Sequence, residues 1–396
     1  MASALSSALS VTNLMAIADG SSANERSRAV KPGAGFASCP QHVWCTWQKE
    51  TKRAEKQESG ADRSTDKMAH GARADEAAHI AGETTRALQL LEAARRATAC
   101  GELEHAQILS DGTLETLEPV RKALRAMISD SPKREANAPA EADVKVTPRQ
   151  ELERNTALAA LRSLDTIFAA VSCLQGNLVL LKHAAPLQGA ETTAQVQAPE
   201  LYEPALFKFR AVWAMCKSAG EDEDNEVRLD PREAPHLEFE AVVGIGTIMM
   251  RTGAHALAET SFIGALATAK GRNDLQEMSA ASLLVATACL RFDPIKKERC
   301  SEYMEKARMY AREHVQHMTG LESENAAAFS VIMLDAAKLW MCNTSCELAD
   351  MYSSSLHDLE AARSCLEEAR EIASSEEKQH DIDARLQALE QRATAQ

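Results

Sequence analysis

The chain has 396 residues, enough for two or three ordinary domains or one long helical solenoid, and 45% of the residues are hydrophobic. Aromatic residues make up only 4%, and there are 17 glycines. Alanine, leucine, glutamate and arginine dominate and favour helices, whereas β-sheets need the β-branched and aromatic residues in which this chain is poor. We therefore expect an all-α protein.

The net charge of -14 is spread unevenly, with +2 on residues 1–75 and -16 on the remainder. An acidic body repels the phosphates of nucleic acids. We therefore expect residues 76–396 to bind no nucleic acid directly and to attract a basic protein surface or peptide instead. The ten cysteines are scattered and fall mostly on apolar helix faces, which is typical of a reducing compartment.

No uninterrupted apolar run reaches the roughly 18–20 residues of a membrane helix, so we expect no membrane segment. The longest candidates are Ala241–Met250 and Ala281–Leu290. Residues 1–18 lack the positive charge of a secretory signal and the arginines of an organellar transit peptide. The expected location is the nucleus or the cytoplasm, with organellar targeting as the less favoured alternative.

The first part of the chain is predicted to be a tail, a region of N-terminal helical repeats with two or three helices, and a linker. Residues 1–72 lack a sustained helical period, which predicts a disordered tail that carries a candidate docking motif at Trp44 and Trp47. Residues 73–128 follow helical spacing and are expected to break at Gly101. Residues 129–148 contain three prolines and are predicted to be a linker.

The remainder, residues 149–396, is predicted to be one helical-repeat domain. Its first helix spans residues 149–183 and is expected to be interrupted by a turn at Gly176 and Asn177. A second helix is expected over residues 201–217. From residue 236 to about residue 392 the helical pattern is nearly continuous.

A repeat pattern emerges over residues 239–270. Small residues stand at the two positions where paired helices must approach closely, a glycine stands at the corner between the helices, and a large residue stands where the gap between them must be filled. This spacing resembles the tetratricopeptide repeat of about 34 residues. The packing residues of this first copy are Gly246, Gly253, Ala258, Phe262 and Ala265.

Two further copies of the pattern are partial. The copy at residues 282–311 places Ala307 at a packing position and has Cys300 where a small alanine is usual. The copy at residues 343–373 requires one inserted residue near positions 353–355, and its packing residues are Ala362, Leu366 and Ala369. A tetratricopeptide-like α-α superhelix is therefore our interpretation, and the alternative is another helical stack or an irregular bundle.

No pattern in the sequence supports a catalytic site, a cofactor site or a metal site, so we expect the protein not to be an enzyme. Cys342 and Cys346 lie four residues apart but lack the further ligands that a metal site needs, and we expect them in the core. Val243 and Thr247 occupy two positions at which chaperone-binding tetratricopeptide domains carry their carboxylate clamp, so that clamp is absent.

Ser131 is a candidate phosphorylation site. It is followed by Pro132, Lys133 and Arg134, which matches the target pattern of cyclin-dependent kinases, and it falls in the predicted linker. Phosphorylation at this position would connect the protein with the cell cycle.

Residues 236–363 resemble the C-terminal tetratricopeptide region of the cohesin-loader helical-repeat subunit. The resemblance runs from Gly253 through Asp274 and Leu275 to the segment Met278–Leu284, and continues in the helices Met304–Ala311 and Ala326–Leu339. It implies repeats that wrap an extended segment of the large loader subunit and help to bring it to chromatin. This chain is shorter than members of that family, and residues 1–72 have no counterpart there.

The sequence thus predicts a non-catalytic scaffold without a cofactor, which grips an extended segment or helix of a protein partner in a concave groove. A role in cohesin loading and chromosome cohesion is the specific expectation from the resemblance. Two alternatives remain open: a cytoplasmic or organellar tetratricopeptide adaptor unrelated to cohesin, and an α-helical enzyme with a site that the sequence does not reveal.

Overall fold

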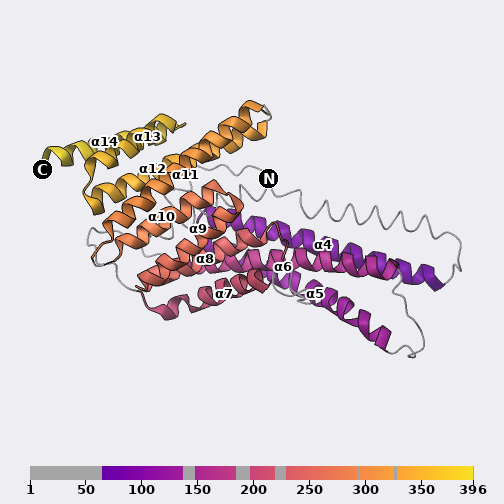
Figure 1. The fold of residues 1–396 in the computed structure, drawn as a ribbon. Helices are drawn as coiled ribbons and strands as arrows, with labels where there is room; N and C mark the ends of the chain where they lie inside the picture. Colours follow the sequence, from indigo (N-terminus) through magenta and orange to yellow (C-terminus); the bar gives the residue numbers. More distant parts are fainter. Residues whose placement is uncertain are drawn as a thin grey trace. The chain divides into compact units, whose positions relative to one another are not determined.

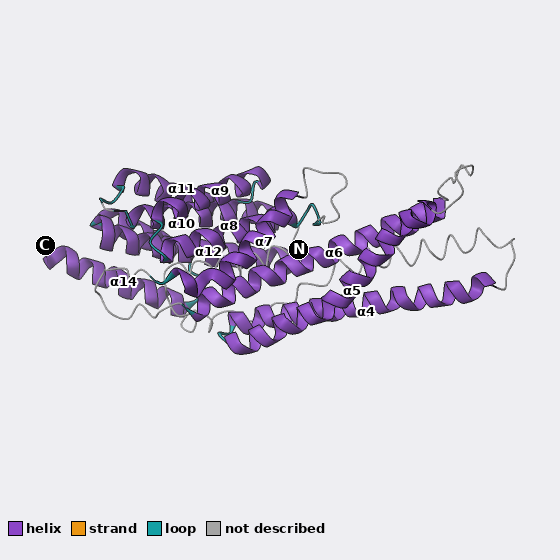
Figure 2. Ribbon diagram, turned by 90° about the horizontal axis from the view of Figure 1, so that it is seen from below, coloured by secondary structure: helices purple, strands orange, loops and turns teal. Residues whose placement is uncertain are grey.

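The computed structural model describes residues 65–136, 148–183, 197–218, 229–292, 294–324 and 328–395. In this part of the chain all regular secondary structure is helical, as the ribbon in Figure 2 shows. The expectation of an all-α protein is therefore confirmed. Contacts within the chain divide the described helices into two compact units, and each is described by itself.

The first unit is built on three long helices, α4 (Thr65–Ala99), α5 (Leu103–Ala136) and α6 (Pro148–Lys182). α4 packs against α5, and α5 packs against α6 (Figure 1). The chain turns from α4 into α5 at Gly101, whose φ of 78° is readily adopted only by glycine, so the predicted break is confirmed. The part of α7 (Glu203–Ser218) from Phe207 onwards also belongs to this unit.

Several predicted boundaries in this region are wrong. α4 begins at Thr65, inside the range predicted as tail, whereas residues 1–64, including Trp44 and Trp47, lie outside the described residues. α5 continues to Ala136 through Pro132, because a proline near the end of a helix removes only one backbone hydrogen bond. The predicted linker is thus reduced to residues 137–147, which are not described.

The predicted domain boundary and the predicted turn within residues 149–183 are also wrong. α6 runs without interruption from Pro148 to Lys182, so Gly176 and Asn177 lie inside a helix. α6 belongs to the same compact unit as α4 and α5, and the predicted domain of residues 149–396 is therefore divided. Sequence spacing could not show this grouping, because it results from contacts between helices that are distant in the chain.

α6 also corrects the expectation that no segment is apolar enough to cross a membrane. Its part Arg154–Lys182 is long enough and has a mean hydropathy of 1.6 over its most apolar window. Polar residues such as Ser172, Gln175 and Asn177 divide its apolar residues into short runs, so no uninterrupted apolar run stands out in the sequence. In the structure 78% of that window is buried, as in the core helix of a folded domain.

The second unit contains the part of α8 (Ala234–Arg251) from Glu238 onwards and all the helices that follow. From α9 onwards each helix packs against the next one along the chain (Figure 1). α10 lies between α9 and α11, and nearly all its side chains are buried. The helices after α8 are α9 (His255–Arg272), α10 (Leu275–Leu290), α11 (Lys297–Glu324), α12 (Ala328–Met351), α13 (Leu359–Ile372) and α14 (Glu376–Ala395).

Local signals in the sequence explain where these helices begin and end. Asp274 and Asp358 cap α10 and α13, because each carboxylate accepts a hydrogen bond from the backbone N–H three residues later. α12 continues into a π-helix, η3 (Tyr352–Leu356), before His357 ends it in the left-handed conformation. A π turn accommodates one extra residue, and this one lies where the repeat pattern required an insertion.

Candidate functional site

The packing residues of the first repeat copy meet at the contact between α8 and α9. Gly246 on α8 faces the ring of Phe262 on α9, and a Cβ atom added to the glycine would lie 2.5 Å from the phenylalanine Cε1 atom. Phe262, Ala258 and Ala265 are fully buried. The chain turns between the two helices at Gly253, whose φ is 80°. The structure therefore brings all five predicted residues of this copy together at one helix pair.

The packing residues of the two partial copies are also buried. The hydroxyl of Ser279 on α10 donates a hydrogen bond of 2.9 Å to the backbone carbonyl of Ala307 on α11, which ties these helices together. Cys300 replaces the usual alanine without disturbing the contact, because its thiol donates to the carbonyl of Ala286 at 3.6 Å. The buried residues of these copies are Ala307, Ala362, Leu366 and Ala369.

A second glycine–phenylalanine contact, which was not predicted from the sequence, occurs in the first unit. A Cβ atom added to Gly176 on α6 would lie 2.6 Å from Cζ of Phe209 on α7. The sequence around Gly176 favours a turn, because the long segment between α6 and α7 hides the spacing of a helix pair. The contact shows that α6 and α7 pack by the same means as α8 and α9.

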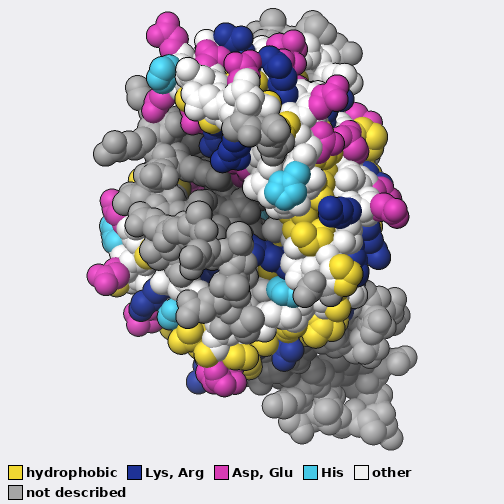
Figure 3. Space-filling view, turned by 90° about the vertical axis from the view of Figure 1, so that its left-hand side faces the viewer, with side chains coloured by type: hydrophobic (Ala, Val, Ile, Leu, Met, Phe, Trp, Pro, Cys, Tyr) yellow, Lys and Arg dark blue, Asp and Glu magenta, His cyan; other side chains and the backbone are white. Residues whose placement is uncertain are grey.

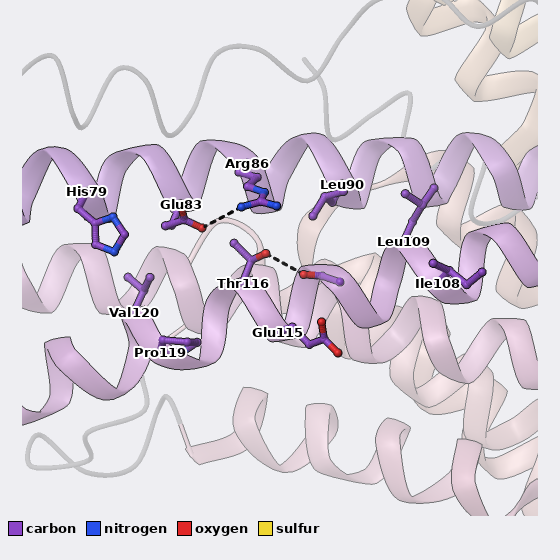
Figure 4. Close-up of a pocket in the computed structure, with 11 residues that line it drawn as sticks. His79, Glu83, Arg86, Leu90, Ile108, Leu109, Glu115, Thr116, Pro119 and Val120 are labelled. Atoms are coloured by element: carbon purple, nitrogen blue, oxygen red, sulfur yellow. Dashed lines mark hydrogen bonds and ion pairs between the residues drawn. The ribbon is translucent and has the colours of Figure 1, made fainter.

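An open groove lies between α4 and α5 in the first unit. Its volume is about 510 Å³. Figure 4 shows the side chains of both helices that line it. Leu90 on α4 and Leu109 and Val120 on α5 supply apolar surface. Ile108 stands at the rim with 69% of its surface exposed. Gly112, which has no side chain, leaves the floor open beside Leu90.

The polar groups of the groove lie along its edges. On α4, Arg86 forms an ion pair of 3.9 Å with Glu83. On α5, Thr116 donates a hydrogen bond of 2.8 Å to the carbonyl of Gly112 (Figure 4). Pro119 lies inside α5 and has no N–H, so the carbonyl of Glu115 loses its usual helical donor. The groove therefore offers apolar area together with carboxylates, which suits an amphipathic protein segment.

The buried ionic groups are engaged in holding helices together. Asp165 on α6 is fully buried and forms an ion pair with Arg121 on α5, while the guanidinium of Arg125 lies 3.8 Å away. Burial raises the pKa of Asp165, and the charges of Arg121 and Arg125 oppose this rise. In the second unit, Glu259 on α9 lies 2.9 Å from both Lys296 and Arg299. These contacts are those of a structural core.

The remaining sites considered in the sequence fall in different places. Cys342 and Cys346 are buried within α12, and no cluster of three or more potential metal ligands is found among the described residues. Val243 and Thr247, at the clamp positions, are buried and cannot reach a ligand. Ser131 lies in helix α5 and not in a linker, so a kinase that binds extended substrate would first have to unwind the end of this helix.

Charged side chains of both signs are interspersed over the face shown in Figure 3, with apolar side chains gathered in bands between them. The exposed large hydrophobic residues of the described chain include Ile108 at the groove and Leu257 on α9, which lies outside the groove.

No protein-family model matches the chain, and no curated protein matches it either.

Proposed function

We propose that this chain is a non-catalytic scaffold that binds an amphipathic segment of a protein partner in the groove between α4 and α5. The observation that carries the proposal is the groove itself, in which apolar side chains form the walls and charged groups form the edges. An amphipathic helix of a partner that lies in a groove between two helices buries its apolar stripe and keeps its polar face in water.

We further propose that the second unit is a tetratricopeptide-like array. Three antiparallel pairs, α8 with α9, α10 with α11 and α12 with α13, would be its repeats, and α14 would be its terminal cap. The contact of Gly246 with Phe262 and the π turn at residues 352–356 support this assignment. The polar character of α14 also supports it, because a terminal repeat must present a water-compatible outer face.

The burial of α10 bears on where a partner would bind. In an open array the first helix of each pair lines the concave surface, but α10 leaves almost no side chain exposed. We therefore assign the partner to the groove of the first unit instead of the concave surface that the sequence suggested.

The partner's chemistry follows from the groove and from the net charge of -14. Glu115 on α5 and Glu83 on α4 both line the groove, so basic residues on the flank of the bound segment would find carboxylates there. The resemblance of residues 236–363 to the cohesin-loader helical-repeat subunit names one candidate, an extended segment of the large loader subunit.

An affinity experiment with matched variants tests the proposal. Wild type, Ile108→Glu and the control Leu257→Glu are immobilised and exposed to nuclear extract, and the bound proteins are quantified by mass spectrometry. We expect the large loader subunit to be retained by wild type and by the control, and reduced at least about tenfold by Ile108→Glu, since loss of about 1.4 kcal/mol is tenfold in affinity. Equal retention by all three would exclude the groove. Failure to recover the loader subunit would exclude the cohesin role.

A further inference from the structure

The turn between α13 and α14 presents two serines to solvent. Ser374 and Ser375 are exposed, and so are Glu376 and Glu377, which begin α14. The hydroxyl of Ser375 accepts a hydrogen bond of 3.2 Å from the backbone N–H of Lys378 and so caps the helix. Ser375 thus already has a structural role, and the exposed hydroxyl of Ser374 lies one residue before this cap.

A small hollow of about 20 Å³ lies beside these serines and is rich in positive charge. Lys338 reaches it from α12 and Lys378 reaches it from α14, and no carboxylate lines it. Lys378 also forms an ion pair of 3.8 Å with Asp381 within α14. Two lysines from separate helices thus lie beside a serine hydroxyl in a chain with a net charge of -14, and their charge suits an anion.

We propose that Ser374 is a phosphorylation site whose phosphate is received by Lys338 and Lys378. In the reaction, the Ser374 oxygen forms a bond to the γ-phosphorus of a magnesium-bound nucleoside triphosphate. The bond from that phosphorus to the β-bridging oxygen breaks, the nucleoside diphosphate leaves, and the hydroxyl proton passes to the catalytic base of the protein kinase. This proposal is independent of the groove between α4 and α5.

The residues after Ser374 indicate the class of kinase. Glu376 and Glu377 lie two and three positions downstream and are exposed, so a kinase with a basic substrate groove would recognise them.

The connection from Ile372 to Glu376 is short, and α14 buries little hydrophobic surface, with Ile382 and Leu389 as its buried apolar side chains. Its other contacts with α12 and α13 are ion pairs at the surface, such as that of Arg385 with Asp350, so the helix can open and present the exposed Ser374 to the enzyme in an extended conformation.

The phosphate would tie α14 to α12. At pH 7 it carries a charge of about -1.5 to -2 and three strong acceptor oxygens, enough to engage both ammonium groups. Lys378 would exchange its contact with Asp381 for the phosphate, while Lys338 would gain a partner across the helix boundary. We therefore expect modification to slow the opening of α14.

The first experiment installs phosphoserine at position 374 of the full chain by genetic encoding and measures hydrogen exchange. We expect the backbone amides of α14 to exchange about tenfold more slowly than in the unmodified chain. This protection should vanish when Lys338→Ala and Lys378→Ala are combined, and it should not occur when phosphoserine is placed at the exposed Ser354 instead. Unchanged exchange, or protection that persists without the two lysines, would overturn the proposal.

A second experiment tests modification directly, first on the wild-type chain. The full chain is incubated with magnesium ATP and a serine kinase that selects acidic substrates, and the modified residue is located by fragmentation mass spectrometry. We expect phosphate on Ser374, no phosphate on this peptide in Ser374→Ala, and at least a tenfold slower reaction when Glu376→Gln and Glu377→Gln are combined. Modification of Ser375 alone, or a rate unaffected by the glutamines, would contradict the assignment.

Discussion

Phe262 lies so close to Gly246 that a Cβ atom added to the glycine would come within 2.5 Å of the phenylalanine Cε1 atom. Gly176 and Phe209 repeat this relationship in the first unit. In both pairs the phenylalanine ring of one helix occupies the space that a side chain at the glycine would take. The axes of the two helices can therefore approach closely. A residue larger than glycine would force the ring or the backbone to move.

Replacement of Gly246 by alanine should therefore destabilise the second unit. A methyl group at this position meets the rigid face of a buried ring, and overpacking of this kind typically costs about 1–3 kcal/mol. Gly271→Ala on α9 is the matched control, because nothing lies within 4 Å of its added Cβ atom and alanine favours the helix by up to about 1 kcal/mol. Unfolding in urea, monitored by circular dichroism, measures the free energy of unfolding of both variants. Equal free energies of unfolding for the two variants would contradict the packing described here.

Loss of the Glu368 carboxylate should weaken the second unit more than loss of an exposed one. Glu368 on α13 is largely buried and forms a 2.5 Å ion pair with Arg308 on α11. Glu368→Ala should lower the free energy of unfolding by about 2 kcal/mol, because it removes hydrogen bonds between charged, poorly hydrated groups. Asp383→Ala, which breaks the solvent-exposed pair with Arg370, should cost less than about 1 kcal/mol. The prediction is wrong if the two substitutions have the same effect in urea.

Asp165 should make the free energy of unfolding increase as pH falls, the opposite of what an ordinary ion-paired carboxylate does. Burial raises the pKa of Asp165 above its ordinary value of 3.8, so the native protein takes up this proton at a higher pH than the unfolded chain does. Its contribution to stability is therefore greatest at low pH and is lost as pH rises through the native pKa.

Asp165→Asn cannot titrate and provides the reference for this effect. The free energy of unfolding of wild type, relative to that of the variant, should increase as pH falls from about 7 towards about 4. Denaturant titrations of both proteins across this range measure the difference. A difference that shrinks on acidification would mean that the charges of Arg121 and Arg125 outweigh burial.

The cysteines should differ sharply in their reactivity. Cys100 is exposed, whereas burial raises the pKa of the Cys365 thiol to about 11. At pH 8 the thiolate fraction of Cys365 is then about one in a thousand, in addition to its inaccessibility. Iodoacetamide should alkylate Cys100 within minutes and leave Cys365 intact until the protein is unfolded in urea. Peptide mass spectrometry at successive times would show whether Cys365 reacts early, which would exclude its burial in the native protein.

The helical class and the corners of the fold could be predicted because they depend on local chemistry. Gly101 and Gly253 are predicted to be turns because residues with helical spacing lie on both sides of each glycine. In the structure both glycines adopt a positive φ, as a turn requires. The same reasoning failed at Gly176, because a glycine that admits a ring from another helix looks the same in sequence as one that turns the chain. Only the position of Phe209 in the folded structure shows that Gly176 admits a ring and does not turn the chain.

The groove could not be predicted from the sequence because its walls come from two helices. Leu90 on α4 and Leu109 on α5 line the groove together, and α5 passes through Pro119 without interruption. Which helix pair leaves its apolar edge uncovered depends on how α6 packs, and that is a property of tertiary structure. The one signal in the sequence is Ile108, a large apolar residue between Gln107 and Leu109 that falls outside the buried face.

Site-specific photocrosslinking tests the central claim most directly. A benzophenone amino acid is placed at Ile108 in the groove or, as the control, at Leu257, which is 59% exposed on α9. After illumination in nuclear extract, we predict one crosslinked partner at position 108, joined through an apolar stripe flanked by basic residues, and no such product at position 257. Crosslinking of the same partner at Leu257 but not at Ile108 would show that the α4–α5 groove is not the binding site.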